Sequence, residues 1–208
     1  MIEKEIPASQ TTNKHPSIFI AEPAPLGLIG LAISALVLAS TDLGFASSTV
    51  KSLMIPWTLF LGATAQLIAG LMEFKRNNIF GATTFTTYSL LWYVVTLTLF
   101  ITIFTGAKFD LVHYAYGLIG FLIFSMILTI ASLMTNKTFF TILVFIDLAL
   151  LALILQILSG ITAVFVGIFL LCVSIFSFYG AAGILLNTMA GKPIFPLGKA
   201  IWKIQHSK

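Results

Sequence analysis

The side chains best suited to chemistry in this sequence are polar groups that interrupt long apolar stretches. Such groups are costly in hydrocarbon, so they are the first candidates for binding a substrate or a proton. Gln66, Asp147 and Asn187 each stand inside an apolar stretch. Another stretch carries a run of hydroxyl groups on Thr83, Thr84, Thr86, Thr87, Tyr88 and Ser89. Trp92 follows Tyr88 by four residues and would share its face of a helix, where both could bind a small polar molecule.

Each of these groups also has a purely structural interpretation. Ser and Thr side chains in membrane helices often donate to a carbonyl of their own helix. Gln66 and Asn187 can hydrogen-bond to neighbouring helices. Asp147 can lie at a subunit contact or stay neutral in an apolar environment, and otherwise it is a candidate for carrying a proton. The residue types alone leave both interpretations open.

Motifs for catalysis and for cofactor binding are missing from the sequence. No Gly-rich phosphate loop, His-x-x-x-His pair, Gly-x-Ser-x-Gly elbow or Cys-x-x-Cys motif occurs. The histidines His15, His113 and His206 stand far apart, and the single cysteine, Cys172, lies in an apolar stretch. We therefore expect no enzyme, no metal site and no cofactor.

Long helices that cross a membrane must position these groups. Of the 208 residues, 59% are hydrophobic and 9% are charged, against about 25% charged in soluble domains. A helix needs roughly 20 apolar residues to cross the hydrocarbon core. The apolar stretches cover residues 25–41, 54–72, 83–105, 112–134, 139–158 and 162–188. We expect an all-α membrane protein with six transmembrane helices in one domain, residues 21–190, between an N-terminal tail (1–20) and a C-terminal tail (191–208).

Charge placement predicts how the chain lies in the membrane. Of the 11 Lys and Arg residues, only Lys51 and Lys108 fall on the side opposite the two tails. The positive-inside rule then places both termini in the cytoplasm. The C-terminal tail sets Trp202 beside Lys203, as interfacial segments do. The net charge of +4 is scattered singly rather than clustered, so we expect membrane lipid, and no nucleic acid, as a partner.

The start of the first helix is unusual because two prolines lie close together there. A helix cannot run through Pro23 and Pro25, whereas Pro25 suits the first helical position. A helix that begins at this point would present the free amides of Leu26, Gly27 and Leu28, with a positive dipole end, to a carboxylate. The alternative is that Pro25 merely starts a short helix at the membrane interface.

Glu22 stands directly before these prolines and is a second candidate for carrying a proton. An ionised Glu22 would compete with an incoming carboxylate for the helix end, while a protonated Glu22 would donate a hydrogen bond to it. The alternative is that Glu22 caps the helix by accepting a hydrogen bond from Gly27 or Leu28 and binds nothing else.

Pairs of glycines three residues apart recur along the chain: Gly27 with Gly30, Gly117 with Gly120, and Gly180 with Gly183. Small residues let helices approach each other closely in lipid. We therefore expect close helix contacts at these pairs, within one chain or between chains.

Two stretches of the sequence resemble a known family of membrane proteins. Residues 22–28, Glu-Pro-Ala-Pro-Leu-Gly-Leu, are similar to the Asn-Pro-Ala-Pro-Leu-Gly-Leu signature of the acetate uptake transporter family, also called the succinate–acetate permease family. Motifs within residues 65–92 resemble that family's second and third helices. Tyr179, Asn187 and residues 196–198 give a weaker match, so the likeness covers nearly the whole chain.

The resemblance implies a six-helix protomer, assembled as a homohexamer in the plasma (inner) membrane. It implies uptake of acetate, and sometimes succinate, by a proton-coupled symporter or an anion channel. The family is described as having a narrow apolar constriction, which Tyr88 matches by motif and Leu31 and Ile146 match by spacing. The chain departs from the family at Glu22, which replaces the signature Asn, and around Ile184, where a Glu is usual.

The expected function is therefore transmembrane transport of acetate and related small carboxylates. The candidates for substrate binding are Glu22, Leu26, Gly27, Gln66, Thr87, Tyr88, Trp92 and Asn187. The candidates for the constriction are Leu31, Tyr88 and Ile146, and those for proton coupling are Glu22 and Asp147. Two alternatives stay open. One is an exporter of ammonium or another small cation, to which fungal members of the family have been linked, and the other is a six-span structural or signalling protein that conducts nothing.

Overall fold

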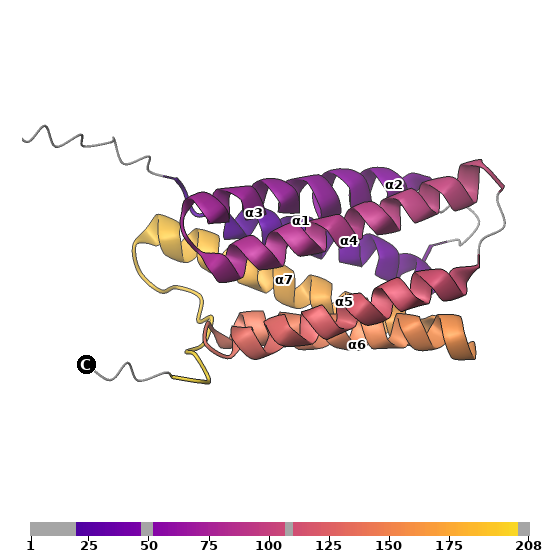
Figure 1. Cartoon of the computed structure of the whole chain (residues 1–208). Coiled ribbons are helices and arrows are strands. Elements are labelled where there is room, and N and C mark those ends of the chain that lie inside the picture. The colour runs from indigo at the N-terminus through magenta and orange to yellow at the C-terminus, as the bar shows by residue number, and fades with distance from the viewer. Residues whose placement is uncertain (1–19, 47–51, 107–109, 204–208) are drawn as a thin grey trace, which may run out of the picture.

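Six helical spans make up the part of the chain that the structure describes, which is residues 20–46, 52–106 and 110–203 of a computed structural model (Figure 1). They are α1 (Ala24–Asp42), a composite span of α2 (Met54–Trp57), η2 (Thr58–Ala65) and α3 (Gln66–Lys75), α4 (Ile79–Phe104), α5 (Leu111–Ser132), α6 (Lys137–Ser159) and α7 (Val164–Ala190). Each span is long and apolar enough to cross a membrane. The prediction of an all-α membrane protein with six spans is confirmed.

The bundle has two ends, which we call the tail end and the loop end. Both described termini, at residues 20 and 203, lie at the tail end together with the α3–α4 and α5–α6 turns (Figure 1). The loop end holds the α1–α2, α4–α5 and α6–α7 connections. α1 packs chiefly on α7, α3 on α4 and α5 on α6, whereas α4 and α5 touch little. The described termini thus share one side, whose assignment to the cytoplasm stays a prediction.

Local capping residues explain where several helices begin and end. The side chains of Asn78, Asp110 and Asn136 accept hydrogen bonds from the first turns of α4, α5 and α6, at 3.2, 2.9 and 3.0 Å. Gly160 and Gly191 end α6 and α7 with φ angles of 70° and 62°, a left-handed conformation that favours Gly. The starts of α4, α5 and α6 are therefore fixed by hydrogen bonds between residues two or three positions apart.

The middle of the second span is a π-helix, η2, which the sequence analysis did not predict. It covers Thr58–Ala65, and π-helical segments are rare and often lie at functional sites. α1 approaches it very closely, because a Cβ at Gly30 would lie 2.2 Å from the carbonyl oxygen of Leu61. A Cβ at Gly62 would lie 2.7 Å from the ring of Trp92. The π-helix thus contacts α1 by its backbone and leaves room for a large aromatic ring of α4.

The glycine pairs divide into internal and external ones. A Cβ at Gly27 would lie 2.6 Å from the ring of Phe85, so α1 uses this face inside the protomer. Around Gly117 and Gly120 of α5, nothing in the described part of the chain lies within 4 Å of where a Cβ would stand. This face of α5 therefore has open space beside it that no described part of the protomer fills.

The segment after α7 folds back over the tail end of the bundle. The carbonyl of Leu197 accepts hydrogen bonds from the backbone N–H and the hydroxyl of Thr138, at 3.1 and 2.9 Å. The N–H groups of Ile201 and Trp202 donate to the carbonyl of Leu133 at 2.9 and 2.8 Å. The C-terminal segment therefore covers the start of α6 and the α5–α6 turn.

Candidate functional site

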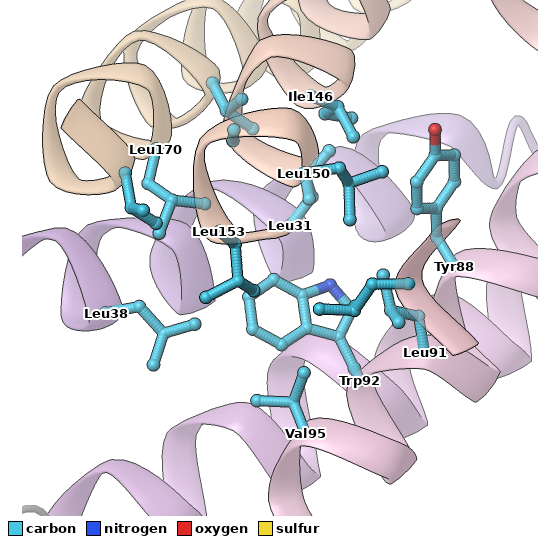
Figure 2. A pocket seen from close by; sticks show the side chains of 14 residues that line it. Leu31, Leu38, Tyr88, Leu91, Trp92, Val95, Ile146, Leu150, Leu153 and Leu170 are labelled. Atoms are coloured by element: carbon cyan, nitrogen blue, oxygen red, sulfur yellow. The ribbon is translucent and has the colours of Figure 1, made fainter. Parts of the chain in front are cut away.

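The interior of the bundle holds two cavities that follow one another along its length. The larger one, about 80 Å³, lies toward the loop end and is lined by residues of α1, α4, α5, α6 and α7 (Figure 2). The smaller one, about 10 Å³, lies toward the tail end and is enclosed by α1, α3, α4 and α6. We call them the loop-side cavity and the tail-side cavity. The tail-side cavity is about large enough for one water molecule.

Three side chains line both cavities and therefore stand between them: Leu31 of α1, Tyr88 of α4 and Ile146 of α6. Their exposed fractions are 6%, 3% and 7%, and we call the three together the neck. Figure 2 shows them as they approach from separate helices. The structure thus brings together the three residues that the sequence analysis selected for a constriction. That they limit passage stays a proposal.

A chain of hydrogen bonds holds the phenol of Tyr88. Its hydroxyl lies 2.6 Å from Ser125 Oγ, Ser125 donates to Asp147 Oδ1, and Thr129 donates to Asp147 Oδ2 at 2.7 Å. A hydroxyl has one proton, and that of Ser125 goes to Asp147, so the Tyr88 proton goes to Ser125. The Tyr88 hydroxyl is therefore committed to α5, and the ring is the part that faces the cavities (Figure 2).

Asp147, a predicted proton-coupling residue, lines neither cavity. It lies on the contact between α5 and α6, where Ser125 and Thr129 are its partners. Neither hydroxyl residue was among the candidates expected from the sequence. Their spacing of four residues places them on one helix face, but only the pairing of α5 with α6 reveals what that face meets.

The tail-side cavity has two unpaired polar atoms in its wall. Gln66 is 1% exposed, and its Nε2 donates to the carbonyl of Gly27 at 3.4 Å. A carbonyl only accepts, which assigns the amide nitrogen to that side and the oxygen to the other. Among the described residues, neither Gln66 Oε1 nor the hydroxyl of Thr84 has a hydrogen-bond partner. An acceptor and a hydroxyl therefore stand ready beside the neck, within an otherwise apolar wall.

Trp92 supplies the polar group of the loop-side cavity. Its indole is buried, with 6% exposed, and lines the wall with Leu150 and Tyr88. Figure 2 shows the indole nitrogen on the ring edge nearer to these two residues. An indole N–H can only donate, so this cavity offers a donor where the tail-side cavity offers an acceptor.

The expectation of free amides at the start of α1 is corrected by the structure. The helix begins at Ala24, and the N–H groups of Leu26 and Gly27 already donate to the carbonyl of Pro23, at 3.0 and 3.3 Å. The side chain of Leu26 is 43% exposed and points out of the bundle. The reason is that the Pro23 carbonyl completes the first turn, so this helix end presents neither amide to a ligand.

Two further candidates lie away from both cavities. Thr87 lines a groove of about 430 Å³ between α4 and α5, with His113 and Tyr114. Asn187 binds the C-terminal segment: its Oδ1 accepts from Ile194 and Phe195 at 2.6 and 2.8 Å, and its Nδ2 donates to the Phe195 carbonyl at 2.8 Å. The structure therefore gives Asn187 a structural role.

Glu22 lies at the tail end and is paired with a residue of the α3–α4 turn. Its Oε2 lies 2.6 Å from Arg76 Nη1, and its Oε1 accepts from the N–H of Ala24 at 3.4 Å. The expected alternative, a cap on Gly27 or Leu28, is not what the structure has. Glu73, the residue directly after the expected apolar stretch 54–72, also lies beside Arg76, at 3.7 Å.

Comparison with known proteins finds a matching family and several relatives. It matches the GPR1/FUN34/yaaH family over residues 6–196. It is 37% identical to the succinate-acetate/proton symporter SatP of Escherichia coli K12 over 73 residues, which are 35% of this chain and 38% of that protein. It is 32% identical to acetate permease A of Emericella nidulans over 143 residues, 64% of this chain and 48% of that protein. The matches thus span less than half the length of these curated relatives.

The fold is similar to that of a solved structure, the bacterial acetate channel SatP. The TM-score is 0.80 at 24% sequence identity, and the match covers 86% of this chain and 100% of that one. At this level of identity the likeness establishes the fold, a bundle of six membrane-spanning helices.

Proposed function

Because the chain belongs to the GPR1/FUN34/yaaH family, we propose that this multi-pass membrane protein transports acetate and related small carboxylates through the neck and its two cavities. The observation that carries the proposal is the pair of unpaired atoms beside the neck, Gln66 Oε1 and Thr84 Oγ1. The names of the relatives, an acetate permease and a succinate-acetate/proton symporter, agree with it. The function is transport rather than catalysis.

The two unpaired atoms are complementary to an undissociated carboxylic acid. Such an acid has one O–H donor, which Gln66 Oε1 can accept, and one carbonyl, to which the Thr84 hydroxyl can donate. An ionised carboxylate has acceptors only and would meet Gln66 Oε1 unfavourably. Burying an ion also costs far more than burying a neutral group. The acid therefore passes the tail-side cavity with its proton, and transport is proton-coupled.

The neck selects substrates by size and by polarity. Its surface consists of Leu31, Ile146 and the ring of Tyr88, whose hydroxyl is held by Ser125. An apolar constriction of this kind excludes hydrated ions because they cannot shed their water there. A short acid can pass with its methyl group against the neck, and Trp92 on the loop side offers the next donor.

We infer how the protein assembles from an exposed face of α5. Nothing in the described part of the protomer lies within 4 Å of a Cβ at Gly117 or Gly120 of α5, and Gly117 lines the groove that contains Thr87. A homohexamer in the plasma membrane, with both termini in the cytoplasm and one path per protomer, would cover this face. Native mass spectrometry in mild detergent should show six chains, and a monomer or dimer would contradict the assembly.

An exporter of ammonium is the second candidate function. Gln66 Oε1 would accept from an ammonium N–H as well as from an acid O–H. However, a cation site would need a carboxylate beside Gln66, and Glu22 and Asp147 line neither cavity. They are bound to Arg76 and to Ser125 and Thr129 instead. The geometry therefore favours the acid.

Uptake into proteoliposomes tests the proposal directly. Purified protein is reconstituted, a pH gradient is imposed, and the entry of labelled acetate and of labelled methylammonium is followed in parallel. We expect acetate to accumulate on the alkaline side faster than in protein-free vesicles, and methylammonium to enter at the protein-free rate. Acetate entry at the protein-free rate would refute transport of carboxylates, and faster methylammonium entry would favour the exporter.

A further inference from the structure

The carboxyl group of Glu73 is buried at the tail end of α3. The side chain is 0% exposed, and its Oε2 accepts a hydrogen bond from Asn78 Nδ2 at 2.9 Å. The first turn of α4 covers it so tightly that a Cβ at Gly81 would lie 2.9 Å from Glu73 Cδ. Its other oxygen, Oε1, has no hydrogen-bond partner in the described part of the chain.

Glu73 shares a cationic neighbour, Arg76, with a second carboxyl group. Arg76 Nη1 lies 2.6 Å from Glu22 Oε2 and 3.7 Å from Glu73 Oε2, so the two carboxyl groups are neighbours. In the described part of the chain, the charged groups that face Glu73 are Glu22 and Arg76, and Asn78 is the neutral donor. The side chains of Arg76 and Glu22 are 31% and 29% exposed, so these two connect the buried carboxyl to solvent.

The charges of these three residues do not balance when both carboxyl groups are ionised. One guanidinium leaves a net charge of −1, part of it on a buried oxygen without a donor, and such an arrangement is costly. A single proton removes the surplus charge. It also supplies the donor that the Glu73 carboxyl group lacks. Two carboxyl groups that share a site readily hold one proton between them.

We propose that Glu22 and Glu73, joined through Arg76, form a proton-binding pair at the tail-end mouth of the transport path. The role of the pair rests on the proposed function, although proton binding itself does not. With the proton bound the mouth is neutral, and without it the mouth carries a negative charge that repels an incoming carboxylate. Acids therefore enter the path from the tail end more readily as the pH on that side of the membrane falls.

The pair is connected to the tail-side cavity by one face of α3. Gln66, Ala69, Gly70 and Glu73 are the buried residues of this helix. Their spacing places them on a single face, and Glu73 lies seven positions after Gln66, about 10 Å along the helix. On the other side, Glu22 precedes α1, whose Gly27 carbonyl binds the amide of Gln66. Glu73 thus lies near the end of α3, the helix that contains Gln66. Glu22 lies just before α1, the helix whose carbonyl binds the Gln66 amide.

Infrared difference spectroscopy against pH tests the pair without any substrate. It is done in an Asp147→Asn background. This change removes the carboxyl group at the contact between α5 and α6, so that its band cannot be mistaken for that of the pair. We expect a band of one protonated carboxyl group that disappears as the pH rises. Both Glu73→Gln and Glu22→Gln should abolish it, because either change leaves one carboxylate matched by Arg76. Asp110→Asn, at an exposed helix cap, should leave it in place.

The Glu22→Gln variant separates the pair from a lone buried acid. If the band persists in this variant, Glu73 holds its proton alone and the pair is refuted, as it is if no such band exists in the parent protein. Glu22 is partly exposed, so this variant is informative even if Glu73→Gln fails to fold. In vesicles, Glu22→Gln should flatten the decline of acetate uptake with rising pH, and an unchanged profile would overturn the role at the mouth. Absence of uptake in the parent protein would refute the proposed function and leave the infrared result standing.

Discussion

The phenol oxygen of Tyr88 and the hydroxyl oxygen of Ser125 lie 2.6 Å apart, and this bond fixes a ring that lines both cavities. Ser125 in turn donates to Asp147, which a second donor, Thr129, holds in place. The neck is thus supported from α5, a helix that adds none of the three neck residues. Its shape depends on a polar network in which every donor has an acceptor.

Replacing Ser125 with Ala should loosen the neck. The buried Tyr88 hydroxyl would lose its acceptor, which costs about 1–3 kcal/mol, and the ring would no longer be held in one position. We expect lower thermal stability and a higher ratio of lactate to acetate uptake. Ser132→Ala is the matched control, because this buried hydroxyl on the same helix donates only to the carbonyl of Thr129. Equal uptake ratios in the two variants would show that the network does not shape the neck.

Shortening Ile146 should widen the neck directly. Ile146→Ala removes the part of the side chain that faces both cavities, and longer monocarboxylates should then pass more easily. The measurement is lactate uptake relative to acetate uptake in vesicles. Ile154→Ala controls for the loss of volume, because Ile154 is buried on the same helix and lines neither cavity. An unchanged ratio in Ile146→Ala would mean that size selection occurs elsewhere.

Removing the amide of Gln66 should slow transport without opening the neck. Gln66→Leu deletes the acceptor beside the neck, and loss of one bond worth about 1.4 kcal/mol in the barrier lowers acetate flux roughly tenfold. The ratio of lactate to acetate uptake should stay the same. Gln156→Leu makes the same change at a position on α6 that lines neither cavity. Wild-type flux in Gln66→Leu at equal protein level would argue against an acid bound at this amide.

The helices could be predicted from the sequence because each span must be long and apolar to cross lipid. The neck could be selected as well, since the resemblance named Tyr88 and spacing suggested Leu31 and Ile146. Hydrogen-bond partners on two different helices could not be predicted from the sequence. Nothing in the sequence pairs Ser125 with Asp147, because the two residues meet only where α5 packs on α6.

Two further features depend on backbone geometry that residue types do not encode. The π-helix over Thr58–Ala65 has no sequence signature, and the close approach of Gly30 to it follows from tertiary packing. The expected second apolar stretch ends at residue 72, directly before Glu73, because charged residues usually mark the ends of spans. The structure buries Glu73 instead, since the helix continues to Lys75 and the first turn of α4 covers its carboxyl group.

The side chain of Asn187 should matter for stability rather than for substrate affinity. Asn187→Ala removes three hydrogen bonds to the C-terminal segment, which should lower the unfolding temperature and expose residues after Gly191 to protease. The acetate concentration that gives half-maximal uptake should not change. Thr188→Ala is the control, because its hydroxyl bonds only within α7, to the Ile184 carbonyl. A raised half-maximal concentration in Asn187→Ala would restore Asn187 as a substrate-binding residue.

Two glycine substitutions of identical chemistry should have opposite outcomes. In Gly30→Ala the new methyl group would lie 2.2 Å from the Leu61 carbonyl oxygen, a backbone atom of the π-helix, so α1 or the second span must move. Overpacking of this kind costs about 1–3 kcal/mol and occasionally more. In Gly117→Ala nothing in the described part of the protomer lies within 4 Å of the new methyl group, and Ala favours a helix over Gly by up to about 1 kcal/mol. Thermal unfolding in detergent should therefore show a large loss for Gly30→Ala and none for Gly117→Ala. Native mass spectrometry of Gly117→Ala reports separately on assembly through that face. If Gly30→Ala unfolds at the wild-type temperature, the close contact between α1 and the π-helix does not exist in the folded protein.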